Sequence, residues 1–291
     1  MDLLLDPYQS EFMRNAAMAS LLVGVLAPVV GVWIVLRRLS YLGDAMSHGT
    51  LAGVAAAFIL GVSVTLGALV AGLIMGALIA VLGTRRRLGE DSVIGVVETI
   101  LFAVGVILIS RNDRKGVELG HYLFGQLTTV NRNDLLLNGF LALVAVAIIV
   151  LNFRDLLAST FDPIHARQVG VRVDLQRYVL MVLVSITVVV SLQTVGLLMS
   201  VAMLVTPAST ARLVTNRVSS MTLVAVGVGV FSSLGGLTLS YHLRSAPGAT
   251  IALTSAACLL VAFAATAPSR RHVHHHGADN TTDPEAVSVA S

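Results

Sequence analysis

The most regular feature of this chain is a series of long stretches without a single charged residue. Residues 45–84 contain no Asp, Glu, Lys or Arg, which is enough for two helices that each cross a hydrocarbon core of about 30 Å. Other charge-free runs are 15–36, 135–153, 178–211, 218–243 and 245–269, and Glu98 alone interrupts 92–110. The pattern predicts nine membrane helices, over 12–36, 44–60, 63–83, 92–110, 135–153, 178–193, 196–212, 218–239 and 249–267.

Composition supports an all-α polytopic membrane protein and argues against three other classes. Of the 291 residues, 56% are hydrophobic and 12% are charged, whereas a soluble domain carries about 25% charged residues. The basic residues lie in short segments between apolar runs, so we expect no nucleic-acid partner. Cys258 is the only cysteine, which excludes a disulfide-stapled secreted domain.

The positions of the arginines predict the orientation. Under the nine-helix count most of them fall on one side, and the positive-inside rule makes that side cytoplasmic. We therefore expect the N-terminus outside and the C-terminus inside, in a cell or plasma membrane. Arg111, Arg114, Lys115 and Arg132 fall on the outer side and contradict the rule, so the topology of 111–134 stays open.

The chain divides into two parts by composition. Residues 1–267 are expected to form the transmembrane domain. Residues 268–291 are polar and contain the motif His-Val-His-His-His at 272–276, which predicts a disordered cytoplasmic tail with no assigned role.

Three ionisable residues lie in or at the edge of the predicted membrane helices: Asp44, His48 and Glu98. Such groups are costly in a bilayer and are candidates for function. Asp44 and His48 are four residues apart, so they share one helix face, and a carboxylate with an imidazole suits a borderline divalent ion. His48 and Glu98 each follow an arginine by ten or eleven residues, so both can lie about 15 Å deep. That geometry permits a shared metal site.

Each of these residues also has an ordinary structural explanation. Asp44 can cap a helix N-terminus, and His48 can be a hydrogen-bonded core histidine. Glu98 can be a buried, protonated acid bonded to a serine or a backbone carbonyl.

The segment 154–170 is expected to be a cytoplasmic loop that contains one short helix. Asp162 followed by Pro163 is a helix-start signal, and Gly170 is a natural stop. The segment predicts either a plain interfacial helix or a docking helix for a cytosolic partner.

Several catalytic motifs are absent from the sequence. It contains no HExxH or GxSxG motif, which leaves protease and hydrolase activities without their best support. The only lysine, Lys115, is not part of a phosphate-binding GxxxxGK[ST] loop. If ATP drives this protein, another chain must bind it.

Four segments together resemble the zinc/manganese/iron ABC-importer permeases, the ABC-3 family of membrane subunits. They are Leu36–His48 (LRRLSYLGDAMSH), the Phe161-Asp162-Pro163 segment with Ala166 and Gly170, the stretch 195–212 (VGLLMSVAMLVTPASTAR), and Ser245–Thr250 (SAPGAT). The likeness extends from about residue 8 to residue 267.

The resemblance implies a homodimeric permease that works with two cytosolic ATPase subunits and an extracytoplasmic metal-binding protein. Asp44 and His48 become transient metal ligands, and 155–170 becomes the coupling helix with Asp162, Pro163, Ala166 and Gly170. Glu98 is not carried over from the family and remains an inference from the residues. The permease itself is expected to be no enzyme and to hold no permanent cofactor.

The identity of the transported metal is left open between Mn²⁺, Zn²⁺ and Fe²⁺, with Mn²⁺ slightly favoured. An acid with a histidine suits Mn²⁺ and Zn²⁺, and a further carboxylate favours the harder ions. The alternatives are a permease for a chelated metal or cobalamin, a secondary metal carrier without an ATPase, and a membrane enzyme.

Overall fold

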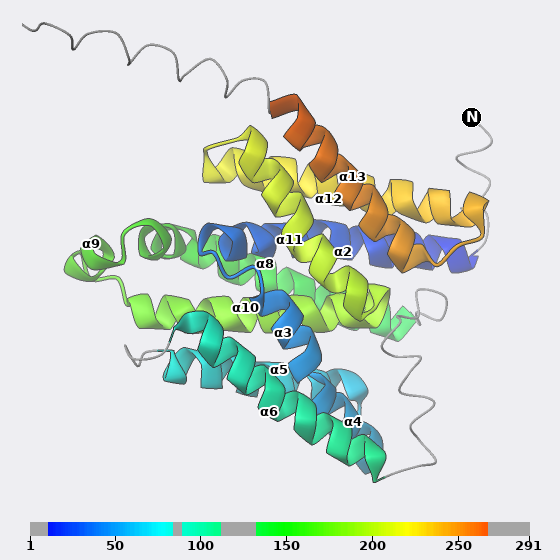
Figure 1. Ribbon diagram of the computed structural model, residues 1–291, viewed down its shortest axis with the longest axis horizontal. Coiled ribbons are helices and arrows are strands. Elements are labelled where there is room, and N and C mark those ends of the chain that lie inside the picture. The colour runs from blue at the N-terminus through cyan, green and yellow to red at the C-terminus, as the bar shows by residue number, and fades with distance from the viewer. Residues whose placement is uncertain (1–10, 84–88, 112–131, 267–291) are drawn as a thin grey trace, which may run out of the picture.

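All regular structure in the described part of the chain is α-helical (Figure 1). The computed structural model describes residues 11–83, 89–111 and 132–266. The predictions for 112–131 and for the tail therefore fall outside the described residues. The helices are α2 (Glu11–Leu36), α3 (Leu42–Gly49), α4 (Leu51–Leu60), α5 (Val64–Leu82), α6 (Glu90–Ser110), α8 (Arg132–Phe161), α9 (Pro163–Gln168), α10 (Val173–Val195), α11 (Leu197–Val214), α12 (Val218–Leu243) and α13 (Pro247–Thr266).

Seven of the helices in these ranges are long and apolar enough to cross a membrane, namely α2, α5, α6, α8, α10, α12 and α13. Each of the nine predicted segments overlaps a described helix. However, the apolar part of α11 is shorter, and the segment 44–60 is split between α3 and α4. The chain is a multi-pass helical membrane protein, while the count of nine spans stays a prediction.

The split between α3 and α4 occurs at Thr50, where side-chain hydroxyls bond to nearby carbonyls. The Ser47 hydroxyl donates to the Gly43 carbonyl at 2.9 Å, and the Thr50 hydroxyl donates to the Ser47 carbonyl at 2.8 Å. Such bonds compete with the helical ladder and bend helices. At 1.5 Å per residue, α3, Thr50 and α4 together still reach about 28 Å.

Helix α8 is longer than predicted, which corrects the expected loop. It extends to Phe161, so Arg154–Thr160 are helical. Nothing in that stretch breaks a helix, whereas Pro163 disfavours a helical backbone at the residue before it. Asp162 accordingly has φ −142° and ψ 86°, and α9 begins on its other side.

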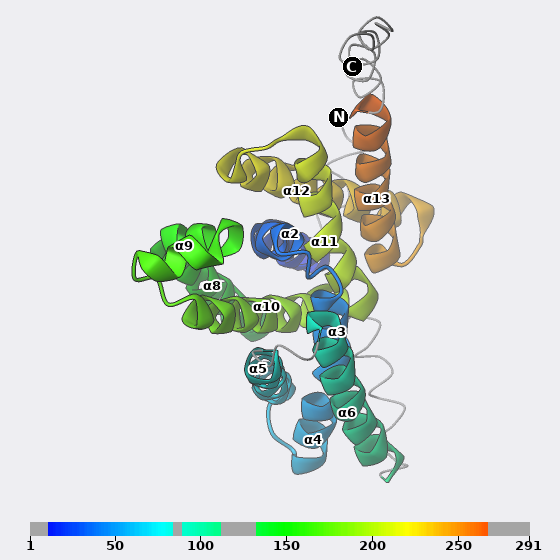
Figure 2. The same cartoon turned by 60° about the vertical axis from the view of Figure 1, so that its left-hand side comes forward.

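Helices α2 and α10 form the centre of the molecule. In each of them 72% of the most apolar stretch is buried, against 17% for α8 and 22% for α6 and α13. In Figure 2, α2 lies between α12 on one side and α8 with α10 on the other. The less buried helices therefore present apolar side chains outward, as lipid-facing helices do.

Helix α11 packs closely on both α2 and α3. A Cβ atom at Gly31 of α2 would collide with the backbone carbonyl of Leu204. The Leu204 side chain in turn lies where a Cβ atom of Gly43 would be, 2.5 Å from that position. Gly31 therefore lets α11 approach α2 closely, and Gly43 leaves room for the Leu204 side chain against the start of α3.

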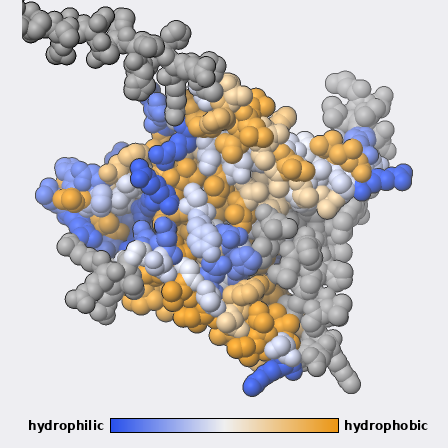
Figure 3. Space-filling model, viewed as in Figure 1, coloured by the Kyte–Doolittle hydropathy of each residue, from blue (hydrophilic) through white to orange (hydrophobic). Residues whose placement is uncertain are grey.

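The surface of the molecule has distinct hydrophilic and hydrophobic regions. In Figure 3 hydrophilic colour gathers around α9, and hydrophobic colour dominates over α4–α6 and over α11–α13. Exposed apolar side chains such as Leu66, Ile100 and Leu260 belong to these hydrophobic regions.

Candidate metal site

Helix α3 carries Asp44 and His48 on one face. The helix begins at Leu42 with Tyr41 as its N-cap residue and no side-chain capping bond, so the alternative that Asp44 is the cap is wrong. Asp44 Oδ1 lies 3.7 Å from His48 Nε2, and their side chains are 38% and 34% exposed. His48 is therefore not a core histidine, and that distance is too long for a hydrogen bond.

Helix α6 brings Glu98 to this pair. One carboxylate oxygen of Asp44, one imidazole nitrogen of His48 and one carboxylate oxygen of Glu98 all lie within 4.8 Å of one another. Glu98 is eight residues after the start of α6 at Glu90, which places it about 12 Å along the helix. The structure thus brings together all three ionisable residues that the sequence singled out.

Two further side chains complete the surroundings of this triad. The hydroxyl of Tyr41 donates to Glu98 Oε2 at 2.5 Å. The ring of Phe102 meets the His48 imidazole edge to face, with centroids 5.6 Å apart and planes at 87°. Glu98 is therefore bonded to a phenol, which differs from the expected alternative of a serine or a backbone carbonyl.

The hydrogen bond to Glu98 raises the pKa of Tyr41 to about 12, and burial and the charges of Glu98 and Asp44 act in the same direction. A tyrosine is protonated at neutral pH even at its ordinary pKa of about 10, so the phenol acts as the donor.

Sequence reasoning assigned no role to Tyr41 or Phe102, although a weak signal existed. Tyr41 precedes Asp44 by three residues, and Phe102 follows Glu98 by four, so each shares a helix face with a candidate ligand. What the sequence does not contain is the pairing of α3 with α6, which makes both contacts.

The triad has the composition of an open site for a divalent ion. Ligands at about 2.1 Å from such an ion, at angles of 90–109°, lie about 3.0–3.4 Å apart. The donor atoms lie within 4.8 Å of one another, with 3.7 Å between Asp44 Oδ1 and His48 Nε2, so binding requires them to approach by at most about 1.4–1.8 Å. Three protein donors also leave positions for water or for a donor on another molecule.

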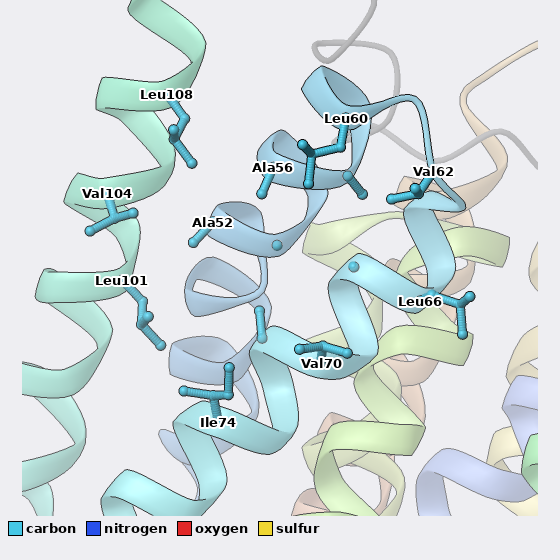
Figure 4. Close-up of a pocket in the computed structure, with 14 residues that line it drawn as sticks. Ala52, Ala56, Leu60, Val62, Leu66, Val70, Ile74, Leu101, Val104 and Leu108 are labelled. Atoms are coloured by element: carbon cyan, nitrogen blue, oxygen red, sulfur yellow. The ribbon is translucent and has the colours of Figure 1, made fainter.

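A cavity that is lined in part by α6 is unsuited to a metal. It is a groove of about 410 Å³ between α4, α5 and α6. Figure 4 shows its walls, with Leu101 and Val104 on α6 facing Ala52 of α4 and Val70 of α5. The lining is entirely aliphatic, with no side-chain donor for a cation.

The segment from Asp162 to Gly170 forms a short helix at one edge of the molecule (Figure 1). Asp162 Oδ1 accepts from the backbone N–H groups of Ile164 at 3.1 Å and His165 at 2.9 Å, and Pro163 is the first helical residue. Ala166 is fully buried, and Gly170 has φ +89°, a conformation that favours glycine. The two expected boundary signals thus operate as predicted.

Apolar side chains remain exposed along this short helix. Phe161, Ile164 and Val169 are all more than half exposed. They lie among Arg167, Asp174 and other charged groups, where Arg167 forms an exposed ion pair with Asp174 at 3.4 Å. An apolar patch with a charged rim is typical of a surface that contacts another protein.

Two arginines connect the helices next to α9 with the helices that carry the triad. Arg37, which follows α2, donates to Ser159 at 2.9 Å and to Thr160 at 3.0 Å near the end of α8. Arg177 of α10 pairs with Glu90 of α6 and donates to the Gly83 carbonyl at 3.2 Å.

Burial lowers the pKa of Arg37, and the charge of Glu90 opposes that shift. Glu90 therefore interacts electrostatically with both Arg37 and Arg177.

Comparison with known proteins shows similarity over nearly the whole chain. The model of the ABC 3 transport family matches residues 9–266. The manganese transport system membrane protein MntC of Halalkalibacterium halodurans is 40% identical over 253 residues, covering 87% of each chain. The manganese import system permease protein ScaB of Streptococcus parasanguinis is 38% identical over 266 residues, covering 91% of this chain and 95% of its own.

A solved structure agrees with the observed arrangement of helices. PsaBC from Streptococcus pneumoniae in complex with Fab superimposes with a TM-score of 0.80 at 34% sequence identity. The match covers 90% of this chain and 94% of the other.

Proposed function

The chain belongs to the ABC 3 transport family, and on that premise we propose that it is the membrane-spanning permease subunit of an ATP-driven importer for divalent transition-metal ions. The observation that carries the proposal is the triad of Asp44, His48 and Glu98, whose donor atoms lie within 4.8 Å of one another between α3 and α6. Ionisable groups at membrane depth mark ion pathways, and this group has the donors of a metal site.

Mn²⁺ is the proposed cargo, ahead of Fe²⁺ and Zn²⁺. Two carboxylates and one imidazole form a harder ligand set than the histidine- and cysteine-rich sets typical of zinc. Two similar proteins named for manganese transport also support this choice.

The wide spacing of the donor atoms in the triad suits transport of an ion better than its storage. A permease has to release its ion, so its site must bind weakly enough for the ion to leave. Partly exposed ligands whose donor atoms have to approach one another by as much as about 1.4–1.8 Å meet that requirement, and a closed four-ligand cage does not.

Transport is proposed to proceed by alternating access. An extracytoplasmic metal-binding protein delivers the ion at the outer face, and Asp44, His48 and Glu98 hold it in transit. ATP-driven movement then opens the path inward. The proposed orientation of the chain in the membrane has the N-terminus outside and the C-terminus in the cytoplasm.

Helix α9 is the proposed contact with the ATPase subunits, and the assembly is a dimer of this chain with two ATPases. The cap at Asp162, the first helical residue Pro163, the buried Ala166 and the left-handed turn at Gly170 give the helix its shape. Its exposed apolar side chains, among them Ile164, offer the contact surface.

Radiometal uptake by the reconstituted complex tests the proposal. Asp44→Ala and His48→Ala are expected to abolish uptake of Mn²⁺ while the complex with the ATPase still assembles, because each change removes a donor from a three-donor site. Competition by Mn²⁺, Fe²⁺ and Zn²⁺ identifies the preferred ion.

Three outcomes would count against the proposal. Normal uptake in both variants would eliminate the site. Uptake of a chelated metal or of cobalamin, without dependence on these ligands, would favour the chelate permease. Uptake without any ATPase subunit would favour a secondary carrier.

A further inference from the structure

Tyr41 connects the two helices that share the triad. It is the N-cap residue of α3, one turn before Asp44, and its hydroxyl donates to Glu98 Oε2 on α6 at 2.5 Å. The side chain is 47% exposed, so packing into the core does not explain where it lies. The hydroxyl is the part of Tyr41 that makes a specific contact.

The contact leaves Glu98 able to bind a cation. A carboxylate has two oxygens and about four lone-pair sites, and the phenol occupies one of these sites on Oε2. A hydrogen bond at that oxygen fixes the rotation of the carboxylate, which a glutamate side chain otherwise samples freely. Partners of this kind orient metal ligands and tune metal sites.

We propose that Tyr41 is a positioning residue of the metal site, whose hydroxyl holds Glu98 of α6 within reach of Asp44 and His48 of α3 and thereby sets the affinity for the ion. The inference rests on the proposed function. It adds to that function a residue that neither binds the ion nor supports the fold.

A purely structural role for Tyr41 is distinguishable, because α3 and α6 have other contacts. The His48 and Phe102 rings pack edge to face, and the Leu101 side chain reaches to within 3.6 Å of where a Cβ atom of Gly49 would be. Removing one exposed hydroxyl therefore leaves the two helices packed. A change in metal affinity without a change in thermal stability is the signature of positioning.

The test is the dissociation constant of Mn²⁺, measured by the electron paramagnetic resonance signal of free Mn²⁺ in the purified permease–ATPase complex. Loss of an outer-shell partner lowers metal affinity by about 10- to 100-fold. Because Tyr41 is half exposed, we expect Tyr41→Phe to raise the dissociation constant about tenfold, at the lower end of that range, without lowering the melting temperature. Tyr241→Phe is the matched control, since Tyr241 is similarly exposed at 51% near the far end of α12.

A double-mutant cycle shows whether the effect passes through Glu98. In the Glu98→Ala background, titrated to millimolar Mn²⁺, Tyr41→Phe should cause no further loss. Wild-type affinity in Tyr41→Phe, or an equal loss in both backgrounds, would overturn the inference.

Asp44→Ala separates this inference from the proposed function. Strong Mn²⁺ binding in Asp44→Ala would refute the site itself, and the inference with it. Loss of binding in Asp44→Ala together with unchanged binding in Tyr41→Phe would refute the inference alone.

Discussion

Replacing Glu98 by Gln removes one of the two negative charges of the triad while it preserves the size of the side chain and one oxygen donor. The Tyr41 hydroxyl still finds an acceptor in the amide oxygen, so the contact between α3 and α6 should persist. The change therefore isolates the electrostatic part of metal binding. We expect Glu98→Gln to weaken binding of Mn²⁺.

The expected loss follows from the distance between the ion and the charge that the variant removes. With the ion about 2.1 Å from a carboxylate oxygen, the centre of the carboxylate charge lies about 3 Å away, where one unit charge attracts a divalent ion by about 3 kcal/mol with the dielectric constant of water and by about 11 kcal/mol with an effective value of 20. Glu98 is half-buried, and glutamine keeps an oxygen donor, so the lower part of that range applies. A loss of about 3–4 kcal/mol corresponds to a dissociation constant raised about 150- to 1,000-fold.

The measurement is equilibrium binding of Mn²⁺ to the purified complex at physiological ionic strength. Asp91→Asn is the matched control, because exposed Asp91 lies on the same helix, seven residues before Glu98. At about 10 Å from Glu98, beyond the screening length of about 8 Å, its charge should alter binding less than about twofold. Binding by Glu98→Gln within threefold of wild type, or an equal loss in Asp91→Asn, would show that the charge of Glu98 does not contribute to metal binding.

Three further changes test the elements around the site. Asp162→Ala removes the cap of α9, which destabilises the helix by about 1 kcal/mol, and should lower the amount of metal taken up per ATP hydrolysed. Asp162→Asn keeps the cap and serves as the control. An unchanged uptake per ATP in the alanine variant would contradict the coupling role. Arg177→Met breaks a half-buried ion pair and should lower the free energy of unfolding, measured by thermal unfolding in detergent, by about 1–2 kcal/mol. The exposed Arg167→Met should lower it by less than about 1 kcal/mol, and equal losses would be evidence against burial as the cause. Gly31→Ala should destabilise the protein by about 1–3 kcal/mol through its collision with α11, while Gly227→Ala, which has open space around its Cβ position, should be neutral or stabilising.

The two arginine links suggest how movement of α9 can reach the metal site. Arg37 joins the end of α8 to the turn before α3, and Arg177 joins α10 to the start of α6. Because α8 and α10 flank α9 in the chain, we expect the displacement of α9 that the proposed coupling requires to be transmitted through these contacts to both elements that carry the triad. The Arg177→Met variant therefore has a second expected effect, a lower uptake per ATP hydrolysed.

Several features of the protein could be predicted from sequence because they depend on local composition. Long charge-free stretches such as 45–84 require helices in a bilayer, since only helices satisfy their own backbone groups there. The boundaries of α9 followed from Asp162, Pro163 and Gly170, each of which acts on its own backbone. The separation of α10 from α11 at Gly196 followed from the excessive length of the run 178–211.

Where local signals were weak, the sequence prediction was less accurate. The stretch 154–161 contains charges and no strong helix signal, and it was expected to be a loop. The structure shows it to be the last two turns of α8, because polar residues continue a helix once it has formed and only Pro163 ends it. The division of 44–60 at Thr50 was missed as well, because hydroxyl bonds such as those of Ser47 and Thr50 also occur within unbroken helices, for example at Thr187 of α10.

The sequence alone predicted a helical membrane protein, and it singled out Asp44, His48 and Glu98 as candidate ionisable residues in or at the edge of the predicted membrane helices. It also paired Asp44 with His48, because four residues on one helix share a face. The packing of the helices, which the sequence does not contain, places Glu98 beside them and brings the Tyr41 hydroxyl into a hydrogen bond with Glu98. Those contacts join residues of α3 and α6 that are 50 or more positions apart in the sequence. The close packing around α3 also involves Leu204 of α11 and glycines such as Gly43, whose neighbours in space the chain order does not reveal.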